Sequence, residues 1–192
     1  MKSSTDKKRQ RRELRSRRGE ISPREQAHAS RRVAVQARGY RQLWAGKRLL
    51  SYSPFQGEID PGPLVAALNS EIFLPRIINY RNRAMQFLKK EKTKHLSPYG
   101  ISEPSLASAR LSARHFDAVL VPLVGFDRNG NRLGMGAGYY DRSFSFRLRQ
   151  DTPRRPLLVG LAHHFQEVNQ LPTNSWDVGL DAIITDLELI II

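Results

Sequence analysis

Residues 117–142, DAVLVPLVGFDRNGNRLGMGAGYYDR, contain the features from which the fold of this chain can be predicted. The continuous apolar run Phe116–Val124 is typical of a central strand buried on both faces of a parallel sheet. Asp127–Gly130 is a turn signal whose Asn-Gly pair suits a β-hairpin. A helix is predicted over Tyr139–Arg149. The stretch therefore predicts a strand, a hairpin, a loop and a helix in succession.

Three glycines alternate with other residues at the loop of this stretch, at positions 134, 136 and 138. Alternating glycines allow successive backbone N–H groups to turn inward and form a concave anion site. The spacing matches neither the dinucleotide fingerprint nor the P-loop, and nine residues separate Val124 from Gly134. Glycine spacing alone leaves a binding loop and a structural turn equally open. The helix predicted behind the loop favours binding, because its N-terminus carries a positive dipole.

Several acidic residues have both a structural and a chemical interpretation. Asp141 is either a partner of the helix dipole or a Mg²⁺ ligand, and Asp60, before a proline, is a natural N-cap. Glu58 and Asp60 are two residues apart at a predicted strand end, where they could face one cleft, although this spacing is also common in loops. Asp177 and Asp181 are either loop acids or a second metal contact. The residues by themselves do not decide between these alternatives.

The elements predicted on either side of this stretch alternate between strands and helices. Strands are expected at Arg48–Phe55, Glu71–Ile77, Met85–Lys89, Leu157–Ala162 and Ala182–Thr185, and helices at Lys8–Arg18, from Ser22 to about Trp44, and at Pro61–Leu68. The segment Pro98–Ala113 is rich in Ser, Pro and Gly and is expected to be a loop. Alternation of this kind predicts a single α/β domain with a mainly parallel central sheet flanked by helices.

The N-terminal quarter carries most of the net charge of +14. Residues 1–48 contain 16 Lys and Arg against 4 Asp and Glu, whereas residues 49–192 contain 16 against 14. We expect residues 1–7 to be a disordered lead-in and residues 8–192 to be one domain with a basic N-terminal helical segment. Leu14 is the only large apolar residue of the predicted helix Lys8–Arg18, so this helix has little to bury. The guanidinium groups of its arginines must therefore be solvated or engaged with a ligand.

Composition limits the class of protein. A chain of 192 residues that is 40% hydrophobic is long enough for one well-buried domain. No run approaches the ~20 apolar residues of a membrane span, and no apolar stretch follows the basic N-terminus as in a secretory signal. The absence of cysteine excludes disulfides and thiolate chemistry. These features predict a soluble cytoplasmic protein. No role is assigned to His163 and His164, which follow a predicted buried strand.

Several ordered motifs together resemble the 5-formyltetrahydrofolate cyclo-ligase family, also called 5,10-methenyltetrahydrofolate synthetase, over about residues 8–190. The matching segments are Arg11–Arg15 (RRELR), Phe55–Asp60 (FQGEID), Gly100–Pro104 (GISEP), Asp117–Arg142, Gly160–Ala162 with Gln166, Leu171-Pro172, and Trp176–Thr185. The block at residues 117–142 is the most specific of them. The resemblance implies a three-layer architecture of the NagB/RpiA/CoA-transferase kind.

The resemblance also implies an activity. Members of the family use ATP and Mg²⁺ to convert 5-formyltetrahydrofolate into 5,10-methenyltetrahydrofolate, with release of ADP and phosphate. The formyl oxygen takes the γ-phosphoryl group, and a neighbouring folate nitrogen then closes the ring. The implied partners of the chain are ATP, Mg²⁺ and a reduced folate, and the implied state is a monomer or weak dimer.

The resemblance implies specific roles for residues of this chain. The ATP-binding residues would be Arg11, Arg12, Arg15, Arg132, Leu133, Gly134, Met135, Gly136, Ala137, Gly138, Tyr139 and Tyr140. The substrate-binding residues would be Phe55, Asp60, Met135 and Tyr139, the metal ligands Asp141 and Asp177, and the catalytic residues Arg132 and Tyr140. Departures from the family pattern are Ala137, where many members carry Lys, Arg11, where Lys is common, and a shortened segment near Asn69-Ser70.

Two other functions remain as alternatives. One is a non-catalytic relative that binds RNA through the basic N-terminal quarter, although the chain has no recognisable RNA-binding signature. The other is a different ATP-using enzyme on the same scaffold, because a fold does not determine a substrate.

Overall fold

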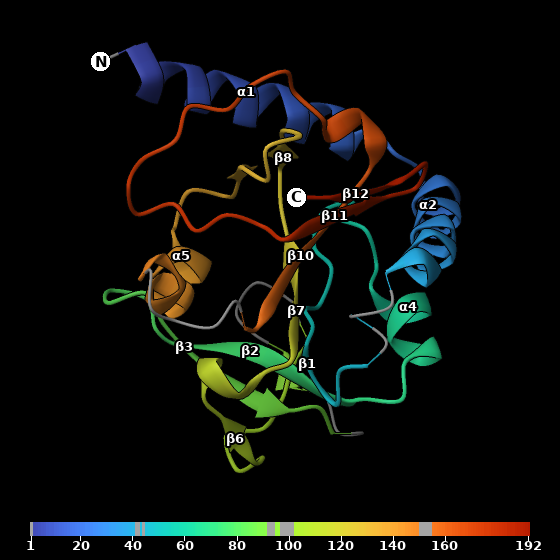
Figure 1. Ribbon diagram of the computed structural model, residues 1–192, viewed down its shortest axis with the longest axis vertical. Helices are drawn as coiled ribbons and strands as arrows, with labels where there is room; N and C mark the ends of the chain where they lie inside the picture. The colour runs from blue at the N-terminus through green and yellow to red at the C-terminus, as the bar shows by residue number, and fades with distance from the viewer. Residues whose placement is uncertain (1, 41–42, 44, 92–94, 97–101, 150–154) are drawn as a thin grey trace.

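The computed structural model describes residues 2–40, 43, 45–91, 95–96, 102–149 and 155–192. Its centre is an eight-stranded sheet in the order β12-β11-β10-β7-β1-β2-β3-β6 (Figure 1). The strands are β1 (Arg48–Leu50), β2 (Glu71–Asn79), β3 (Ala84–Lys89), β6 (Arg110–Leu111), β7 (Ala118–Pro122), β10 (Leu157–Ala162), β11 (Ala182–Thr185) and β12 (Leu189–Ile191). Smaller two-stranded sheets pair β4 (His95–Leu96) with β5 (Ser102–Glu103) and β8 (Gly125–Phe126) with β9 (Arg132–Leu133).

The sheet is parallel in its middle and antiparallel at both edges. β2, β1, β7, β10 and β11 run parallel to one another, whereas β12, β3 and β6 are antiparallel to their neighbours. The predicted mainly parallel α/β sheet is therefore confirmed. The edge strand β12 was not predicted. It pairs with β11 because the chain turns back at residues 186–188, and its sequence has no alternation of apolar and polar residues that would indicate a strand.

The alternation of side chains along β7 builds a core on each face of the sheet. Ala118 and Leu120 belong to the cluster covered by the helices α2 (Pro23–Gln36) and α4 (Gly62–Ala67). Val119 and Val121 belong to the cluster that contains Phe144 of α5 (Tyr139–Phe144). Figure 1 shows α2 and α4 on one side of the sheet and α5 on the other. The strand predicted at Phe116–Val124 is thus buried on both faces, and the helices complete three layers.

Several predicted helix ends differ in the structure. α2 begins with the predicted capping box of Ser22 and Glu25 but ends at Gln36, and a 3-10 turn, η1 (Ala37–Gly39), follows. Tyr40 has φ −102° and ψ 80°, which is not helical, and its ring is buried, so core packing overrides the continuing apolar periodicity. The predicted end near Trp44 lies outside the described residues. α5 is likewise shorter than predicted and continues as the 3-10 helix η3 (Ser145–Leu148).

The first helix, α1 (Lys2–Gly19), starts earlier than expected. Residues 2–7, for which the sequence predicts disorder, are helical in the structure. A tertiary contact provides the reason, because Lys7 Nζ lies 2.9 Å from Asp177 Oδ2 and ties this end of the helix to the body. Further along α1, Leu14 is buried against β8, where a Cβ on Gly125 would come within 2.6 Å of the leucine side chain. A helix with very little apolar surface is therefore docked at a few specific points.

One predicted strand and one predicted loop differ in the structure. The strand expected at Arg48–Phe55 ends at Leu50, and the predicted loop Pro98–Ala113 contains β5 and β6, with the 3-10 turn η2 (Ala113–His115) after them. These short strands form only by pairing with distant partners, β6 with β3 and β5 with β4, which local sequence does not encode. Gly100 and Ile101 of the motif GISEP lie outside the described residues.

Candidate active site

A cavity of about 930 Å³ opens at the carboxyl ends of β1 and β7, which are neighbours in the sheet. Chain order reverses between these two strands, because β1 continues outward to β2 whereas β7 continues on the other side to β10. Such a switch point is where open α/β sheets bind their ligands. Tyr52 and Ser53 line the cavity just after β1, and Pro122 and Leu123 line it at the end of β7.

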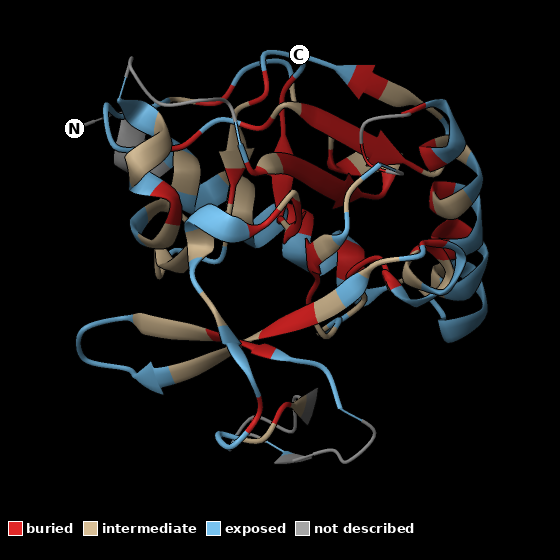
Figure 2. Ribbon diagram, turned by 60° about the horizontal axis from the view of Figure 1, so that its bottom comes forward, coloured by how far each residue is buried: buried red, intermediate tan, exposed pale blue. Residues whose placement is uncertain are grey.

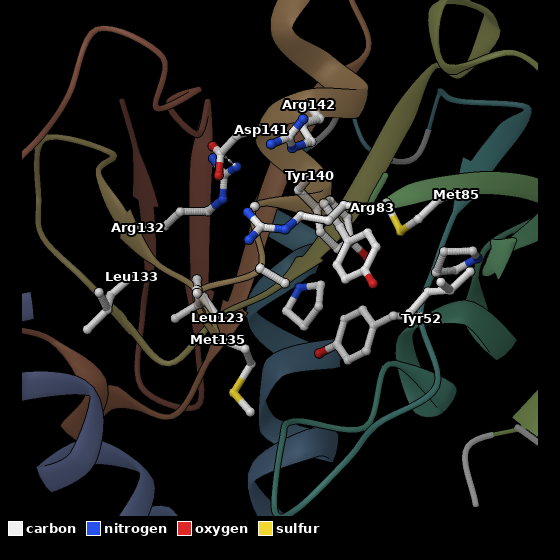
Figure 3. Close-up of a pocket in the computed structure, with 18 of the residues that line it drawn as sticks. Tyr52, Arg83, Met85, Leu123, Arg132, Leu133, Met135, Tyr140, Asp141 and Arg142 are labelled. Atoms are coloured by element: carbon white, nitrogen blue, oxygen red, sulfur yellow. Dashed lines mark hydrogen bonds and ion pairs between the residues drawn. The ribbon is translucent and has the colours of Figure 1, made fainter. Parts of the chain in front are cut away.

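The glycine loop, Gly134–Gly138, forms one wall of this cavity (Figure 3). Gly136 has φ +102° and Gly138 has φ +70°, conformations that side chains with a Cβ rarely adopt. Within the described part of the chain, no backbone N–H of Gly134–Gly138 donates a hydrogen bond to a protein carbonyl. These N–H groups are available to an anion. The helix behind the loop has only six residues, so its dipole adds less than the predicted longer helix would.

Arg132 and Asp141 form a buried pair at the edge of the loop. Arg132 Nη2 donates to Asp141 Oδ1 at 2.6 Å, and Arg132 Nη1 donates to the carbonyl of Val178. The same Asp141 oxygen accepts the Val178 N–H at 3.1 Å. The Arg132 side chain is only 7% exposed, and burial lowers the pKa of its guanidinium while Asp141 opposes this shift. Figure 3 shows the two side chains facing each other at the cavity.

Asp177 is the second predicted metal ligand, and it lines the same cavity as Asp141. Its Oδ2 accepts hydrogen bonds from Lys7 Nζ and from the backbone N–H of Asn174, both at 2.9 Å. In the described residues, Oδ2 of Asp141 and Oδ1 of Asp177 have no protein partner. Magnesium commonly takes one or two carboxylates together with phosphate oxygens and water. Two carboxylates in one cavity, each with a free oxygen, fit this preference.

The three arginines predicted to contact phosphate are divided between two hollows. Arg11 lines the cavity, and its Nε donates to the carbonyl of Gly134 at 2.8 Å. Burial, followed by repulsion from Arg15, lowers the pKa of the Arg11 guanidinium. Arg12 and Arg15 line only the neighbouring groove between α1 and the N-terminus of α2, which Arg11 borders as well, and Arg15 Nη2 donates to Gln56 Oε1 at 3.3 Å. The structure therefore brings Arg11, but not Arg12 or Arg15, to the glycine loop.

Two tyrosines and a glutamate make up the innermost wall. Tyr52 donates its hydroxyl to the carbonyl of Ile59 at 2.7 Å, whereas the buried hydroxyl of Tyr140 has no hydrogen-bond partner in the described residues. Burial raises the pKa of Tyr140, so its phenol is neutral and can donate. Glu58 is 8% exposed, and burial raises its pKa although Arg18 lies 3.5 Å away and opposes the shift.

The predicted folate-binding residues also separate. Phe55, Met135 and Tyr139 line the cavity. Asp60 is not among the lining residues, and its Oδ1 accepts the Gly62 N–H at 2.8 Å at the start of α4. Asp60 thus makes a structural contact, but the N-cap of α4 is Pro61 and not Asp60 as predicted, and the contact of Asp60 with a folate stays a prediction.

Sequence reasoning missed several cavity residues, including Tyr52, Arg83, Glu103 and Trp176. Glu58 was noticed as one of a pair of acids but received no role. The side chain of Arg83 reaches the cavity through the pairing of β2 with β3, and that of Glu103 reaches it from β5, which pairs with β4. No local spacing signals such a placement. The cavity as a whole combines a phosphate-type loop, buried guanidinium groups, two acids and an aromatic wall.

Comparison with known proteins was made against this geometry. The chain matches the 5-formyltetrahydrofolate cyclo-ligase family over residues 3–186. It is 33% identical over 188 residues to the 5-formyltetrahydrofolate cyclo-ligase of Haemophilus influenzae, covering 94% of this chain and 98% of the relative. It is 31% identical over 178 residues to the enzyme of the same name from Escherichia coli strain K12, with coverages of 90% and 96%.

Solved structures agree with these sequence relatives. The NMR structure of Aquifex aeolicus 5,10-methenyltetrahydrofolate synthetase superposes with a TM-score of 0.80 at 27% identity, covering 96% of this chain and 92% of the other. A 5,10-methenyltetrahydrofolate synthetase from Mycoplasma pneumoniae superposes with a TM-score of 0.73 at 24% identity, with coverages of 94% and 99%. The second likeness is one of fold.

Proposed function

The chain belongs to the 5-formyltetrahydrofolate cyclo-ligase family, and we propose that it converts 5-formyltetrahydrofolate into 5,10-methenyltetrahydrofolate at the cavity between β1 and β7, using ATP and Mg²⁺. The observation that carries this proposal is the Arg132–Asp141 pair beside a glycine loop with free N–H groups, with Asp177 in the same cavity. A cavity of about 930 Å³ lies at the upper end of the roughly 300–1,000 Å³ usual for ligand sites, as two adjacent ligands require.

The phosphate chain of ATP would lie against the glycine loop. The N–H groups of residues 134–138 and the guanidinium of Arg11 supply donors on one side, and Arg132 supplies positive charge from the buried side. Bound Mg²⁺ would neutralise phosphate charge, with Asp141 and Asp177 as its protein ligands. Arg12 and Arg15 are directed to the neighbouring groove, so we assign them to the outer field that attracts anions rather than to direct contact with the transferred phosphoryl group.

The reduced folate would lie against the aromatic and apolar side of the cavity. Phe55, Met135 and Tyr139 offer surfaces for its rings, and the unpartnered hydroxyl of Tyr140 offers a hydrogen bond to the formyl group or the phosphate. Burial of Tyr140 keeps this hydroxyl protonated at neutral pH. Residues placed in this way would hold the two ligands next to each other, and positioning is the main requirement of phosphoryl transfer.

The proposed chemistry needs no protein nucleophile. The formyl oxygen attacks the γ-phosphorus of ATP, the bond to the β-phosphate oxygen breaks, and ADP leaves. The neighbouring folate nitrogen then attacks the formyl carbon and gives up its proton to the phosphate or to water, and the carbon–oxygen bond breaks with release of phosphate. Phosphorylation is a sensible activation, because an amide oxygen is otherwise a poor leaving group. Arg132 and the loop N–H groups would stabilise the charge that develops on the transferred group.

The remaining expectations concern the setting of the enzyme. In the part of the chain that is described, none of the helices has the length and apolar character needed to cross a bilayer. We propose a cytoplasmic enzyme that acts as a monomer or weak dimer on a small-molecule substrate. RNA binding through the basic N-terminal quarter is less favoured, because Lys7, Arg11 and Arg18 of α1 are directed to the body of the protein.

An isotope experiment tests the proposed mechanism. The substrate is prepared with ¹⁸O in its formyl group and incubated with the protein, ATP and Mg²⁺. We expect one ADP for each methenyl product and ¹⁸O in the released phosphate, because the formyl oxygen leaves with phosphorus. Label found in water, or ring closure at the same rate without ATP, would contradict phosphorylation of the formyl oxygen.

A further inference from the structure

The hairpin of β2 and β3 forms a wall of the cavity that the sequence analysis did not assign. Ile77 pairs with Met85 in this hairpin, and Pro75 lies two residues before Ile77 on the same face. All three side chains line the cavity, and so does Arg83, which lies at the hairpin turn two residues before Met85. Figure 2 shows this hairpin reaching away from the buried centre of the molecule. The wall is therefore apolar along its length and cationic at its tip.

Arg83 has an unusual backbone for its residue type. Its φ is +53°, in the left-handed region that glycine and asparagine occupy far more readily than arginine. The turn contains Asn82 directly before it, whose N–H is held by Asn79 Oδ1 at 2.9 Å. Arg83 itself is exposed but lines the cavity, and Figure 3 shows its side chain extending into the space between Met85 and Arg132. The conformation thus directs a long cationic side chain toward the site.

The guanidinium of Arg83 has no partner among the residues that the structure describes. Of the other cavity cations, Lys7 is engaged with Asp177, Arg11 with the Gly134 carbonyl and Arg132 with Asp141, whereas the exposed Arg142 on α5, like Arg83, has no side-chain partner among the described residues. Glu103 also lines the cavity but is paired with Arg76 at 3.5 Å. Within the described residues, Arg83 makes no hydrogen bond and no ion pair, so all its N–H donors are free. A free guanidinium fork is suited to a carboxylate or phosphate oxyanion.

We propose that Arg83 is an oxyanion-binding residue that the hairpin contributes to the site opposite the glycine loop. Its ligand is an oxyanion of one of the two substrates, either the phosphate chain of the nucleotide or the glutamate carboxylates of the reduced folate. This role rests on the proposed function and adds to it a ligand-binding group from a wall with no other unpaired charge among the described residues.

Calorimetric binding to the intact chain tests this proposal. The two probes are 5-formyltetrahydrofolate and a non-hydrolysable ATP analogue with Mg²⁺, each titrated into wild type, Arg83→Gln and Arg81→Gln. Arg81 is a matched control, since it lies in the same turn, is exposed and does not line the cavity. We expect Arg83→Gln to weaken one of the two ligands roughly tenfold or more, the cost of a charge-assisted hydrogen bond, and Arg81→Gln to leave both unchanged.

Two further arms identify the ligand and exclude a structural cause. A folate analogue whose glutamate carboxylates are both amides should bind equally to wild type and Arg83→Gln if Arg83 contacts these carboxylates. Arg83→Gly relieves the positive φ, so it should unfold at the same or a higher temperature and yet bind as weakly as Arg83→Gln. Unchanged binding of both ligands by Arg83→Gln, or an equal loss in Arg81→Gln, would overturn the role of Arg83. Wild type that binds neither ligand would refute the proposed function as well.

Discussion

The two carboxylate oxygens of Asp141 differ in their surroundings. One oxygen of Asp141 fixes the guanidinium and a backbone N–H, while its other oxygen has no protein partner among the described residues. Arg132 is almost fully buried, and the neighbouring Asp141 opposes the lowering of its guanidinium pKa by burial. A structural role and a metal-binding role of Asp141 are therefore compatible, since Oδ1 accepts hydrogen bonds from the protein and Oδ2 is available to a metal ion.

The sequence predicted well those site residues that are close together along the chain. Arg132, the glycine loop and Asp141 lie within ten residues, so local spacing was sufficient to group them. Arg83 and Glu58 reach the cavity through strand pairing and burial, and the sequence around them contains no comparable signal. Asp60 shows that a local pattern can be nearly right, because its carboxylate accepts a backbone N–H at the start of α4 although the N-cap itself is Pro61.

Tyr140→Phe separates a ligand contact from a structural one. The hydroxyl has no partner in the described residues, so its removal should leave the free energy of unfolding unchanged or raise it by up to about 1 kcal/mol. The proposed contact with substrate predicts a fall in kcat of roughly tenfold to a hundredfold. Steady-state kinetics and denaturant unfolding measure the two effects.

Tyr52→Phe is the matched comparison for this prediction. Its hydroxyl is buried and donates to the carbonyl of Ile59, so its loss should destabilise the protein by about 1–2 kcal/mol. A Tyr140→Phe protein that is destabilised as much as Tyr52→Phe, with kcat unchanged, would show that the hydroxyl has no part in the reaction.

Among the elements, α1 places Arg11 beside the glycine loop, where the phosphate chain of ATP is proposed to bind. The helix has almost no apolar surface, and the sequence identified Leu14 as its only large apolar residue. The structure adds the reason that this one residue is sufficient: Gly125 leaves room for it, and Arg18 is buried with hydrogen bonds to the carbonyls of Gln56 and Leu123. Tertiary contacts of this kind also set the helix ends, which is why the predicted boundaries were less accurate than the predicted elements.

Leu14→Ala should loosen α1 without changing the residues that contact ligand. Leu14 is buried with Val124, Leu133 and Leu171, so the substitution should lower the free energy of unfolding by about 2–3 kcal/mol. Displacement of Arg11 from Gly134 should also raise the KM for ATP several-fold. Denaturant unfolding and initial rates at varied ATP provide the two measurements.

Arg9→Ala is the control for this substitution on the same helix. Arg9 is 60% exposed and makes only a 3.9 Å surface ion pair with Glu13, which is worth less than about 1 kcal/mol. A rise of the KM for ATP in Arg9→Ala as large as that in Leu14→Ala would contradict this account, because Arg9→Ala leaves the docking of α1 intact.

For the whole molecule, the sheet order brings together segments that are far apart in sequence. The cavity forms where strand order reverses between β1 and β7. The alternation of strands and helices, together with the buried run at residues 116–124, was sufficient to predict the parallel centre of the sheet. The antiparallel edges, β3 with β6 and β11 with β12, depend on pairing that no local pattern specified. His163, which received no role from sequence, connects the end of β10 to the loop at Gly57 through a 2.9 Å hydrogen bond.

This connection makes the stability of the whole fold sensitive to pH. His163 Nδ1 accepts the Gln166 N–H while Nε2 donates to Gly57, so the ring is neutral, and burial lowers its pKa below the ordinary 6.5. The unfolded chain therefore takes up a proton more readily. The stabilisation is complete above pH 6.5 and is lost as the pH falls from there toward the folded-state pKa.

Denaturant unfolding at pH 7.5 and pH 5.5 measures this effect. We expect the contribution of His163 to fall by on the order of 1 kcal/mol. His163→Gln, which cannot titrate, should reduce the difference between the two pH values, whereas His28→Gln at an exposed position of α2 should not. The same pH difference in His163→Gln and wild type would contradict a neutral buried ring.

The central claim is that ATP-driven ring closure takes place in the cavity beside the glycine loop, with Asp141 as a ligand of the Mg²⁺ ion. The most direct measurement is the absorbance of the methenyl product in mixtures of purified protein, 5-formyltetrahydrofolate, ATP and Mg²⁺, for wild type and Asp141→Asn. The asparagine can retain the hydrogen bonds to Arg132 and Val178, so the variant should remain folded. We predict ATP-dependent product with wild type and at least a hundredfold lower rate with the variant, the size typical of a lost charge-stabilising group. Folded wild type that forms no product, or a variant that turns over at the wild-type rate, would contradict the claim.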